Sequence, residues 1–338
     1  MPRAAPYQIR VADTEYSYFC EPGENILRAG LRAGIGIPYE CNAGGCGSCK
    51  IELVTGEIED LMPAAPGIRA RERKRNRVLA CQCTPLTNCE IRTRVAPEFI
   101  APVPSLRFEA RFVASRDITA DIREFVFAAV GPSCFLPGQY AVLNLPSLHR
   151  SRAYSMSNQP NKAGEWGFMI RRVPDGLVSN YLFDVLKIGD SIYIEGPLGL
   201  AYLRPHTSRD IVCVAGGSGL APVVSIVNAQ QSGEPGPGTR WLFYGGRGPA
   251  DIPEFGQLIL TGTPTRVHTS VSVAALAAGA GWRGDVCFVH ELLERNLPAP
   301  LATYDYYLAG PPPMIEVLVR MLVAQKVSLG SIRYDRFF

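Results

Sequence analysis

Residues 38–53 read PYECNAGGCGSCKIEL, and the cysteines of this stretch decide the fold of the first part of the chain. Their spacing is Cys41-x4-Cys46-x2-Cys49, and a fourth cysteine, Cys81, follows 32 positions after the third in the run LACQC. Thiolates suit soft metal sites. Glycines between the cysteines allow tight or left-handed turns and expose N–H groups that can donate to sulfur. These glycines are Gly44, Gly45 and Gly47.

The pattern C-x4-C-x2-C…C is the ligand spacing of plant-type [2Fe–2S] ferredoxins. We therefore predict a [2Fe–2S] cluster with Cys41, Cys46, Cys49 and Cys81 as its ligands. Zinc is the alternative, but zinc sites usually show two short C-x2–4-C pairs, and only one is present. Cys83 competes with Cys81, which better fits the pattern because it directly follows the apolar run VLA. The other cysteines are interpreted as small buried apolar residues: Cys20, Cys83, Cys89, Cys134, Cys213 and Cys287.

Composition places the chain among soluble globular proteins. Its 338 residues suggest two or three domains, 47% are hydrophobic and only 19% are charged. A net charge of +3 is too balanced for nucleic acid or a membrane surface as the main partner. The N-terminus lacks the apolar stretch of a signal peptide, and the uncharged segment 211–231 contains Gly and Pro, which makes it a poor membrane span. We expect a cytoplasmic monomer with reduced thiols.

Three regions differ in pattern. The Pro-rich stretch VAPEFIAPVPSL (95–106) indicates a linker after a cysteine-rich domain. Short strand-like runs separated by Gly and Pro then predict a β-barrel; they lie at 107–113, 123–130, 140–145, 166–173 and 191–196. After residue 206, strands alternate with helices, including a helix at 313–325, which predicts a parallel α/β sheet. The expected domains are 1–95, 106–205 and 206–338.

The motif SRAYSMSN (151–158) indicates a flavin site. A barrel strand with Arg-x-Tyr-Ser resembles the flavin site of the ferredoxin–NADP⁺ reductase superfamily. Arg152 can bind a phosphate with paired hydrogen bonds, Tyr154 can lie flat on the isoalloxazine, and Ser155 can donate to its N5 or O4 edge. Tyr154 and Ser155 are the predicted catalytic residues, and Ala153 lies between them and Arg152.

The segment IRRVPDGLVSNYL (170–182) matches the second flavin motif, where a turn and a helix N-terminus hold the pyrophosphate. Because this motif normally serves a pyrophosphate, FAD is expected rather than FMN. The residues predicted to bind FAD here are Ile170, Arg171, Gly176, Leu177, Val178 and Ser179.

Three glycine loops predict a nicotinamide site. CVAGGSGLAP (213–222) follows a strand and opens a helix, and Pro222 is tolerated in its first turn. YGGR (244–247) and AGPPPM (309–314) also follow strands, so all three loops should lie at the carboxyl edge of the sheet. Asp251, and the lack of a cationic cluster after Arg247, favour NADH over NADPH. The predicted contacts are Gly217, Ser218, Gly219, Leu220, Ala221, Pro222, Gly245, Arg247, Gly310, Pro311, Pro312 and Met314.

The order ferredoxin, flavin barrel and nicotinamide domain resembles the reductase components of bacterial multicomponent oxygenases. Residues 38–53 and YDRFF (334–338) are similar to the reductases of toluene-type diiron monooxygenases. GPLGLAYLR (196–204) and residues 213–227 are equally similar to those of naphthalene-type Rieske dioxygenases. The resemblance implies a β-grasp ferredoxin domain, an antiparallel flavin barrel and a parallel-sheet nicotinamide domain. It also implies an EC 1.18.1-type oxidoreductase that passes electrons from NADH through FAD and [2Fe–2S].

The implied acceptor is the ferredoxin or terminal oxygenase of an aromatic hydrocarbon mono- or dioxygenase. Rival readings are the reductase of a sugar deoxygenation system, a stand-alone ferric or quinone reductase, and a redox sensor. A sensor would usually bring an output domain, for which no residues remain. The family usually has Cys where this chain has Ala309, which puts the efficiency of hydride transfer in question.

Two further features leave alternatives open. Phe337 and Phe338 resemble the aromatic end that covers the flavin in relatives, although ordinary core packing explains them equally well. The basic run before Cys81 is either a solvated surface helix or a docking patch for an acidic redox partner. It consists of Arg69, Arg71, Arg73, Lys74, Arg75 and Arg77.

Overall fold

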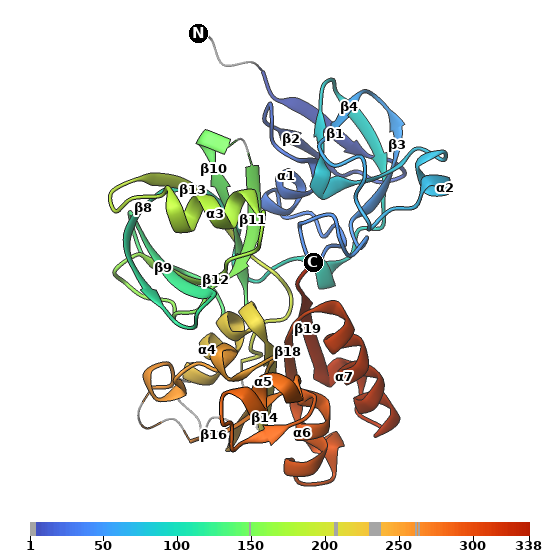
Figure 1. Cartoon of the computed structure of the whole chain (residues 1–338). Coiled ribbons are helices and arrows are strands. Elements are labelled where there is room, and N and C mark those ends of the chain that lie inside the picture. The colour runs from blue at the N-terminus through green and yellow to red at the C-terminus, as the bar shows by residue number, and fades with distance from the viewer. Residues whose placement is uncertain (1–4, 149, 206–208, 230–237, 261, 263) are drawn as a thin grey trace. The chain divides into compact units, whose positions relative to one another are not determined.

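The computed structural model of the chain describes residues 5–148, 150–205, 209–229, 238–260, 262 and 264–338. These residues form two compact units (Figure 1). The first comprises Met1–Leu106, Gly196–Leu200 and Phe338, and the second comprises Arg107–Glu195 and Ala201–Phe337. The cysteine-rich region therefore folds as one unit, whereas the predicted barrel and the predicted α/β sheet share the other.

The first unit is built on a mixed five-stranded sheet. Its elements are β1 (Tyr7–Val11), β2 (Ser17–Cys20), α1 (Ile26–Arg32), β3 (Lys50–Thr55), β4 (Ile58–Asp60), α2 (Ala70–Arg73), β5 (Arg77–Leu79), β6 (Cys83–Pro85) and β7 (Cys89–Arg92). The sheet order is β2-β1-β7-β3-β5, and β4 pairs with β6 separately. β1 and β7 are parallel and the other pairs are antiparallel. Helix α1 packs against β2, which confirms the predicted β-grasp fold.

Asn25 connects this helix to the last of the four predicted ligands. Its Oδ1 accepts a hydrogen bond of 2.8 Å from the Arg28 N–H and so caps α1, an interaction that contributes about 0.5–2 kcal/mol. Its Nδ2 donates to the carbonyl of Cys81 at 3.1 Å. Because Asn25 is buried, this single side chain fixes the short 3₁₀ turn Ala80–Gln82 against the start of the helix.

The first half of the second unit is the barrel, although Leu106 and the end of its last strand from Gly196 onward belong to the first unit. Its elements are β8 (Leu106–Asp117), β9 (Ile122–Ala129), β10 (Tyr140–Leu145), β11 (Arg150–Ser155), β12 (Glu165–Arg171), α3 (Leu177–Asp184) and β13 (Ser191–Leu198). The strand order is β11-β10-β13-β8-β9-β12, and an antiparallel bridge between Met156 and Phe168 joins the two ends. Alternate residues fill the interior with aromatic rings, as Phe125 and Phe127 do on β9. All the strands predicted for this region are present.

The second half is a parallel sheet with helices on both faces. Its elements are β14 (Ile211–Gly216), α4 (Leu220–Asn228), β15 (Arg240–Gly246), β16 (Thr265–Val271), α5 (Ala274–Gly279), β17 (Asp285–Val286), α6 (Val289–Asn296), β18 (Asp305–Gly310), α7 (Pro312–Ala324) and β19 (Ile332–Arg336). The order β17-β16-β15-β14-β18-β19 reverses direction at β14, which pairs in parallel with both β15 and β18.

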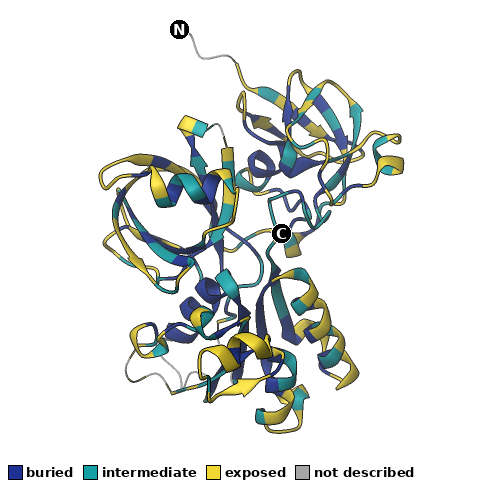
Figure 2. Cartoon of the chain, in the orientation of Figure 1, coloured by how far each residue is buried: buried dark blue, intermediate teal, exposed yellow. Residues whose placement is uncertain are grey.

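The period of two along β14 explains why this strand is apolar throughout. Cys213 and Ala215 pack with α4 on one face, whereas Val212 and Val214 pack with α6 and α7 on the other. Figure 2 shows the central strands of this sheet in the colour of buried residues. Ligands of open α/β sheets bind where the strand order reverses, beyond the carboxyl ends of the strands. In the described parts of the chain, no helix combines the length and the apolar character that crossing a bilayer requires.

Candidate functional site

The loop that carries the first three cysteines depends on glycine for two different reasons. Gly44 and Gly47 have φ of +80° and +77°, a region that residues with a Cβ rarely adopt. A Cβ on Gly47 would also lie 2.5 Å from the Gly67 carbonyl oxygen. Gly45 has no positive φ, but a Cβ there would lie 2.2 Å from Cγ of Phe338, a residue of the same unit. The predicted turn role is confirmed for Gly44 and Gly47, whereas Gly45 is required for clearance.

Backbone N–H groups of this loop point at sulfur. The N–H groups of Ala43 and Cys46 donate to Sγ of Cys41, and that of Ser48 donates to Sγ of Cys46, each at 3.4 Å. Hydrogen bonds of this kind stabilise a thiolate and tune the potential of a cluster that the thiolates bind. The donor set and its surroundings therefore fit an iron–sulfur cluster.

The four thiols associate two by two. A thiol hydrogen bond joins Cys41 with Cys46 and lowers the pKa of Cys46 to about 5, while it raises that of Cys41. A second one joins Cys49 with Cys81. Across the described ranges, no three His, Cys, Asp or Glu side chains gather as the ligands of one ion. Two pairs of thiols are the arrangement that a two-iron cluster needs, because each iron takes two thiolates.

Cys81 and Cys83 have different surroundings. Cys81 lies in the 3₁₀ turn, pairs with Cys49 and accepts a hydrogen bond of 3.5 Å from Gln82 Nε2. Cys83 lies in β6 opposite Asp60, and burial together with the Asp60 carboxylate raises the pKa of its thiol. The geometry thus favours Cys81 as the fourth ligand, while Cys83 behaves as a buried strand residue.

The first flavin motif lies on β11, at one end of the barrel sheet. Arg152 is exposed, and among the described residues its guanidinium bonds to the neighbouring Ser151 carbonyl at 2.9 Å, which leaves other N–H groups for a phosphate. Tyr154 packs on the barrel core, and burial raises the pKa of its hydroxyl. Ser155 is buried and lies opposite Tyr140 in the register of β10 and β11. Ala153 is half-buried between these residues.

The second flavin motif forms a turn into α3, which packs against β11 and so brings the two motifs together. Gly176 is the N-cap of α3. The Ser179 hydroxyl accepts from the Val173 N–H at 3.1 Å and donates to the Gly176 carbonyl at 3.2 Å. Its side chain therefore shapes the turn, and the ligand donors offered here are the first N–H groups of the helix, at Leu177 and Val178. Ile170, in contrast, is fully buried in the barrel core.

The glycine loop after β14 packs against the loop after β18. Gly217 has a φ of +58°. A Cβ on Gly219 would lie only 2.0 Å from the carbonyl oxygen of Ala309. Gly310 has a φ of +152°, and a Cβ there would lie 2.7 Å from Cε of Met314. The two loops approach so closely only because both contain glycine, and they meet at the reversal of strand order.

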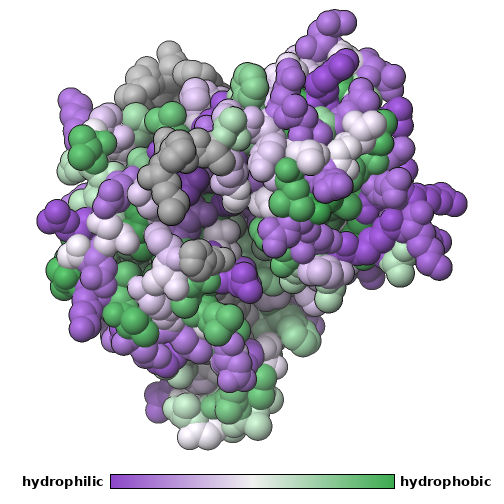
Figure 3. Space-filling view, turned by 90° about the horizontal axis from the view of Figure 1, so that it is seen from above, coloured by the Kyte–Doolittle hydropathy of each residue, from purple (hydrophilic) through white to green (hydrophobic). Residues whose placement is uncertain are grey.

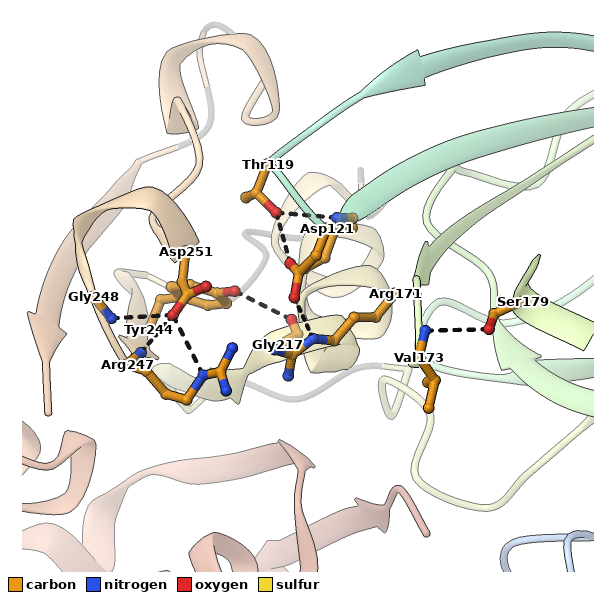
Figure 4. A network of polar contacts seen from close by, with 11 residues as sticks. Thr119, Asp121, Arg171, Val173, Ser179, Gly217, Tyr244, Arg247, Gly248 and Asp251 are labelled. Atoms are coloured by element: carbon orange, nitrogen blue, oxygen red, sulfur yellow. Dashed lines mark hydrogen bonds and ion pairs between the residues drawn. The ribbon is translucent and has the colours of Figure 1, made fainter. Parts of the chain in front are cut away.

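Two side chains lie at Gly217, Tyr244 from β15 of the parallel sheet and Arg171 from β12 of the barrel (Figure 4). The Tyr244 hydroxyl donates to its carbonyl at 3.2 Å. Nη1 of Arg171 lies 3.5 Å from where a Cβ of Gly217 would be, and Nε of Arg171 donates to Asp121 at 2.6 Å. Thr119 in turn bonds to Asp121 at 3.2 Å. The Arg171 guanidinium of the barrel is thus held beside the glycine loop that follows β14, where it could bind a pyrophosphate.

The other residues predicted to contact the nicotinamide nucleotide lie in the loops and helix starts at this edge of the parallel sheet. Arg247 and Gly248 donate their N–H groups to Asp251 at 2.8 and 3.0 Å, which closes the loop after β15. Gly245 lies at the end of β15 beside Gly216. Ser218 lies in the glycine turn, and the Leu220 N–H bonds to the carbonyls of Gly217 and Ser218 within that turn. The first turn of α4, which holds Leu220, Ala221 and Pro222, is buried, and Pro222 has no N–H to donate. Pro311 and Pro312 start α7.

The last two aromatic residues have separate positions. Phe337 packs on the core beside α4, and its N–H donates to the Gly310 carbonyl at 2.9 Å. Phe338 belongs to the first unit and is 55% exposed. Ala309 is buried in the same core as Phe337. Ordinary packing therefore accounts for Phe337, and Phe338 lies against the cluster loop.

Sequence reasoning missed three residues that shape the site. Asp121 orients Arg171, Tyr244 holds Gly217, and the Ser225 hydroxyl donates to the Asn158 carbonyl at 2.8 Å, which ties α4 to the barrel. Asp121 and Ser225 carry no local motif. Tyr244 directly precedes the glycines of YGGR, so its place at a strand end was the only available signal.

Comparison with known proteins agrees with this geometry. Residues 9–86 match the 2Fe-2S iron-sulfur cluster binding domain family, 109–202 the oxidoreductase FAD-binding domain family, and 213–320 the oxidoreductase NAD-binding domain family. The ferredoxin–NAD(+) reductase component of the alkene monooxygenase system of Xanthobacter autotrophicus is 38% identical, over 95% of this chain and 98% of its own.

Two further proteins extend the likeness. The reductase component of the naphthalene 1,2-dioxygenase/salicylate 5-hydroxylase systems of Ralstonia sp is 36% identical over 94% of both chains. The solved structure of the ferredoxin reductase in carbazole 1,9a-dioxygenase superposes with a TM-score of 0.90 at 35% identity, over 99% of both chains. The predicted three-domain fold and the predicted [2Fe–2S], FAD and NAD domains are confirmed. This chain belongs to the family of ferredoxin–NAD(P)⁺ reductases that act as reductase components of oxygenase systems.

Proposed function

We propose that this protein is the NADH-dependent reductase of a bacterial multicomponent oxygenase that acts on aromatic hydrocarbons. The observation that carries the proposal is that two pairs of thiols in one unit occur together with a flavin turn and a glycine loop in the other, where Arg171 of the barrel lies beside the glycine loop. When bound, FAD accepts a hydride and releases its two electrons singly to a one-electron carrier.

The residues of the chain have binding and orienting roles in this proposal. Arg152 and the first N–H groups of α3 hold the FAD phosphates, Tyr154 supports the ring, and Ser155 lies at its polar edge. Arg171 and the glycine loop orient NADH, and orientation supplies most of what the protein adds to hydride transfer. Cys41, Cys46, Cys49 and Cys81 hold the cluster. We assign the domains to residues 1–95, 106–205 and 206–338.

NADH is the proposed donor rather than NADPH. Asp251 is fixed beside Arg247 by two backbone N–H groups, and its carboxylate would repel a 2′-phosphate placed at this strand end. The test compares kcat/KM for the two nucleotides in the wild type and in Asp251→Asn, which keeps an acceptor for both N–H groups. We expect a strong NADH preference that falls in the variant. A wild type that prefers NADPH would overturn this assignment.

The proposed acceptor is a ferredoxin or terminal oxygenase component. Plant-type clusters lie near roughly −400 mV and Rieske centres at about −150 mV or above. The gap of about 250 mV corresponds to roughly four decades at 59 mV each, so transfer to a Rieske centre would be strongly downhill. Likeness to reductases of carbazole and naphthalene dioxygenases favours an aromatic substrate, and likeness to an alkene monooxygenase reductase keeps a diiron partner as the alternative.

A cytoplasmic monomer is the proposed form. None of the ten cysteines forms a disulfide, which fits a reducing compartment where NADH is supplied.

The reductase function is tested by mixing protein that carries flavin and cluster with NADH and cytochrome c. We expect NADH oxidation coupled to cytochrome reduction. No NADH oxidation by fully loaded protein would overturn the function. Supplying a purified Rieske ferredoxin and a diiron hydroxylase as rival acceptors then distinguishes the two oxygenase classes by their rates of reduction.

A further inference from the structure

The segment Arg69–Arg77 presents a dense cluster of positive charge. It contains six basic residues and one acid, Glu72. Arg73 forms an ion pair with Asp60, and Glu72 pairs with Lys50 at 3.0 Å. Glu52, which lies opposite Arg77 in the register of β3 and β5, pairs with Arg92 at 3.1 Å, so these three carboxylates are already engaged. Five cations on the segment are exposed and form no ion pair with any described residue. We call these five the basic patch: Arg69, Arg71, Lys74, Arg75 and Arg77.

The basic patch is anchored to the cluster loop at both of its ends. On its N-terminal side, the Gly67 N–H donates to the Gly44 carbonyl at 2.9 Å, and Gly67 is in contact with Gly47. On its C-terminal side, β5 ends at Leu79, two residues before Cys81. Lys50, which pairs with Glu72, directly follows Cys49. The segment that carries the patch is therefore tied to the loop of the predicted cluster ligands, from which electrons leave in the proposed function.

The basic patch forms no ion pair with the described residues, and Glu72 is the one acid within its segment. Helix α2 has no buried residue, and Figure 1 places it at the outer edge of the first unit. Figure 3 shows hydrophilic side chains along that edge of the surface. Five like charges on nine residues repel one another. The chain tolerates this cost beside the cluster loop although its overall charge is only +3.

We propose that the basic patch docks the acidic face of the electron-acceptor protein. This inference rests on the proposed function and specifies the charge of its partner. A protein with clustered carboxylates is attracted over about one Debye length and is oriented before contact, with its acceptor centre facing the cluster loop. One electron then leaves the reduced protein and reduces the acceptor, and no bond forms or breaks.

The test uses one acceptor in two charge states, namely native cytochrome c, which is basic, and succinylated cytochrome c, which is acidic. The variant Arg71→Glu/Lys74→Glu/Arg75→Glu reverses three charges of the patch. At low ionic strength we expect its kcat/KM for the succinylated form to fall about tenfold and its kcat/KM for the native form to rise. High salt should remove both differences.

The matched control is Lys162→Glu/Arg283→Glu/Arg320→Glu, which changes the net charge equally at exposed sites of the other unit. Equilibrium binding of succinylated cytochrome c, measured by sedimentation, tests docking without turnover. Flavin reduction by NADH, followed by stopped flow, tests the proposed function separately. The docking proposal is overturned if the patch variant binds and reduces both acceptors like the wild type. It is also overturned if the control variant loses as much, because net charge would then explain the effect.

Discussion

The two units of this protein prepare their redox sites by different means. In the first, four side chains carry the chemistry, and three of them lie within nine residues of one loop. In the second, the donors are mainly backbone N–H groups, and side chains such as Ser179 and Tyr244 hold the backbone in place. Side-chain ligands depend on residue identity, whereas backbone ligands depend on conformation and on clearance. The two kinds of site should therefore fail under different substitutions.

The largest effect should come from removing a thiolate. Cys46→Ser should lower cytochrome c reduction about a hundredfold or more, because the one-electron exit is lost. NADH-dependent ferricyanide reduction should persist, since the flavin can reduce ferricyanide directly. Cys83→Ala is the matched control and should keep the cluster absorption that Cys81→Ser loses. Unchanged cytochrome c reduction in Cys46→Ser would show that electrons do not leave through the cluster.

Adding one methyl group to the glycine loop of the second unit should lower the rate of the reaction almost as strongly. Gly219→Ala places a Cβ 2.0 Å from the Ala309 carbonyl oxygen, so one of the two loops must move. We expect the second-order rate of flavin reduction by NADH to fall about 10- to 100-fold, because misplacement of about 1 Å costs this much. Gly256→Ala meets no atom within 4 Å and serves as the control. A normal rate in Gly219→Ala would mean that the loop does not position the nicotinamide.

The variant Arg152→Ala tests whether a side chain also contributes to FAD binding. The Arg152 guanidinium forms no ion pair with a carboxylate in the described part of the chain, so Arg152→Ala removes the proposed phosphate ligand without unpairing a described carboxylate. A hydrogen bond to a charged group contributes about 1.5–3 kcal/mol, and FAD affinity should fall about 10- to 100-fold. Arg111→Ala, on an exposed position of β8, is the control. FAD release followed by fluorescence measures both, and equal affinities would remove Arg152 from the site.

The smallest effect is expected at Tyr244. Tyr244→Phe removes the hydrogen bond to the Gly217 carbonyl, which contributes about 0.5–1.5 kcal/mol, so the Kd for NADH should rise about two- to tenfold. Burial raises the pKa of this hydroxyl, so it remains a donor throughout the neutral range. The ratio of variant to wild-type Kd should therefore not change between pH 6 and pH 9. A pH-dependent ratio would assign the effect to another group.

The cysteine spacing was sufficient to predict the cluster, because ligand identity and separation are properties of the chain itself. The same holds for the strand runs and for the order of the three domains. The partner of Arg171 could not be predicted, since Asp121 is 50 residues away and carries no motif. Gly45 was expected to serve a turn, yet its neighbour Phe338 explains it. Ser179 was predicted to bind FAD as part of this turn, and only the structure shows that its hydroxyl bonds within the turn.

The amino-acid sequence alone determined which chemical groups this protein has, because thiols, glycines and apolar periods are local properties. The tertiary structure alone decided which of them meet. The thiols associate in two pairs, Arg171 lies beside Gly217, and Gly219 lies against Ala309. Each of these contacts joins segments that are distant along the chain or depends on the bends of a loop. Their geometry follows from packing, which no local pattern encodes.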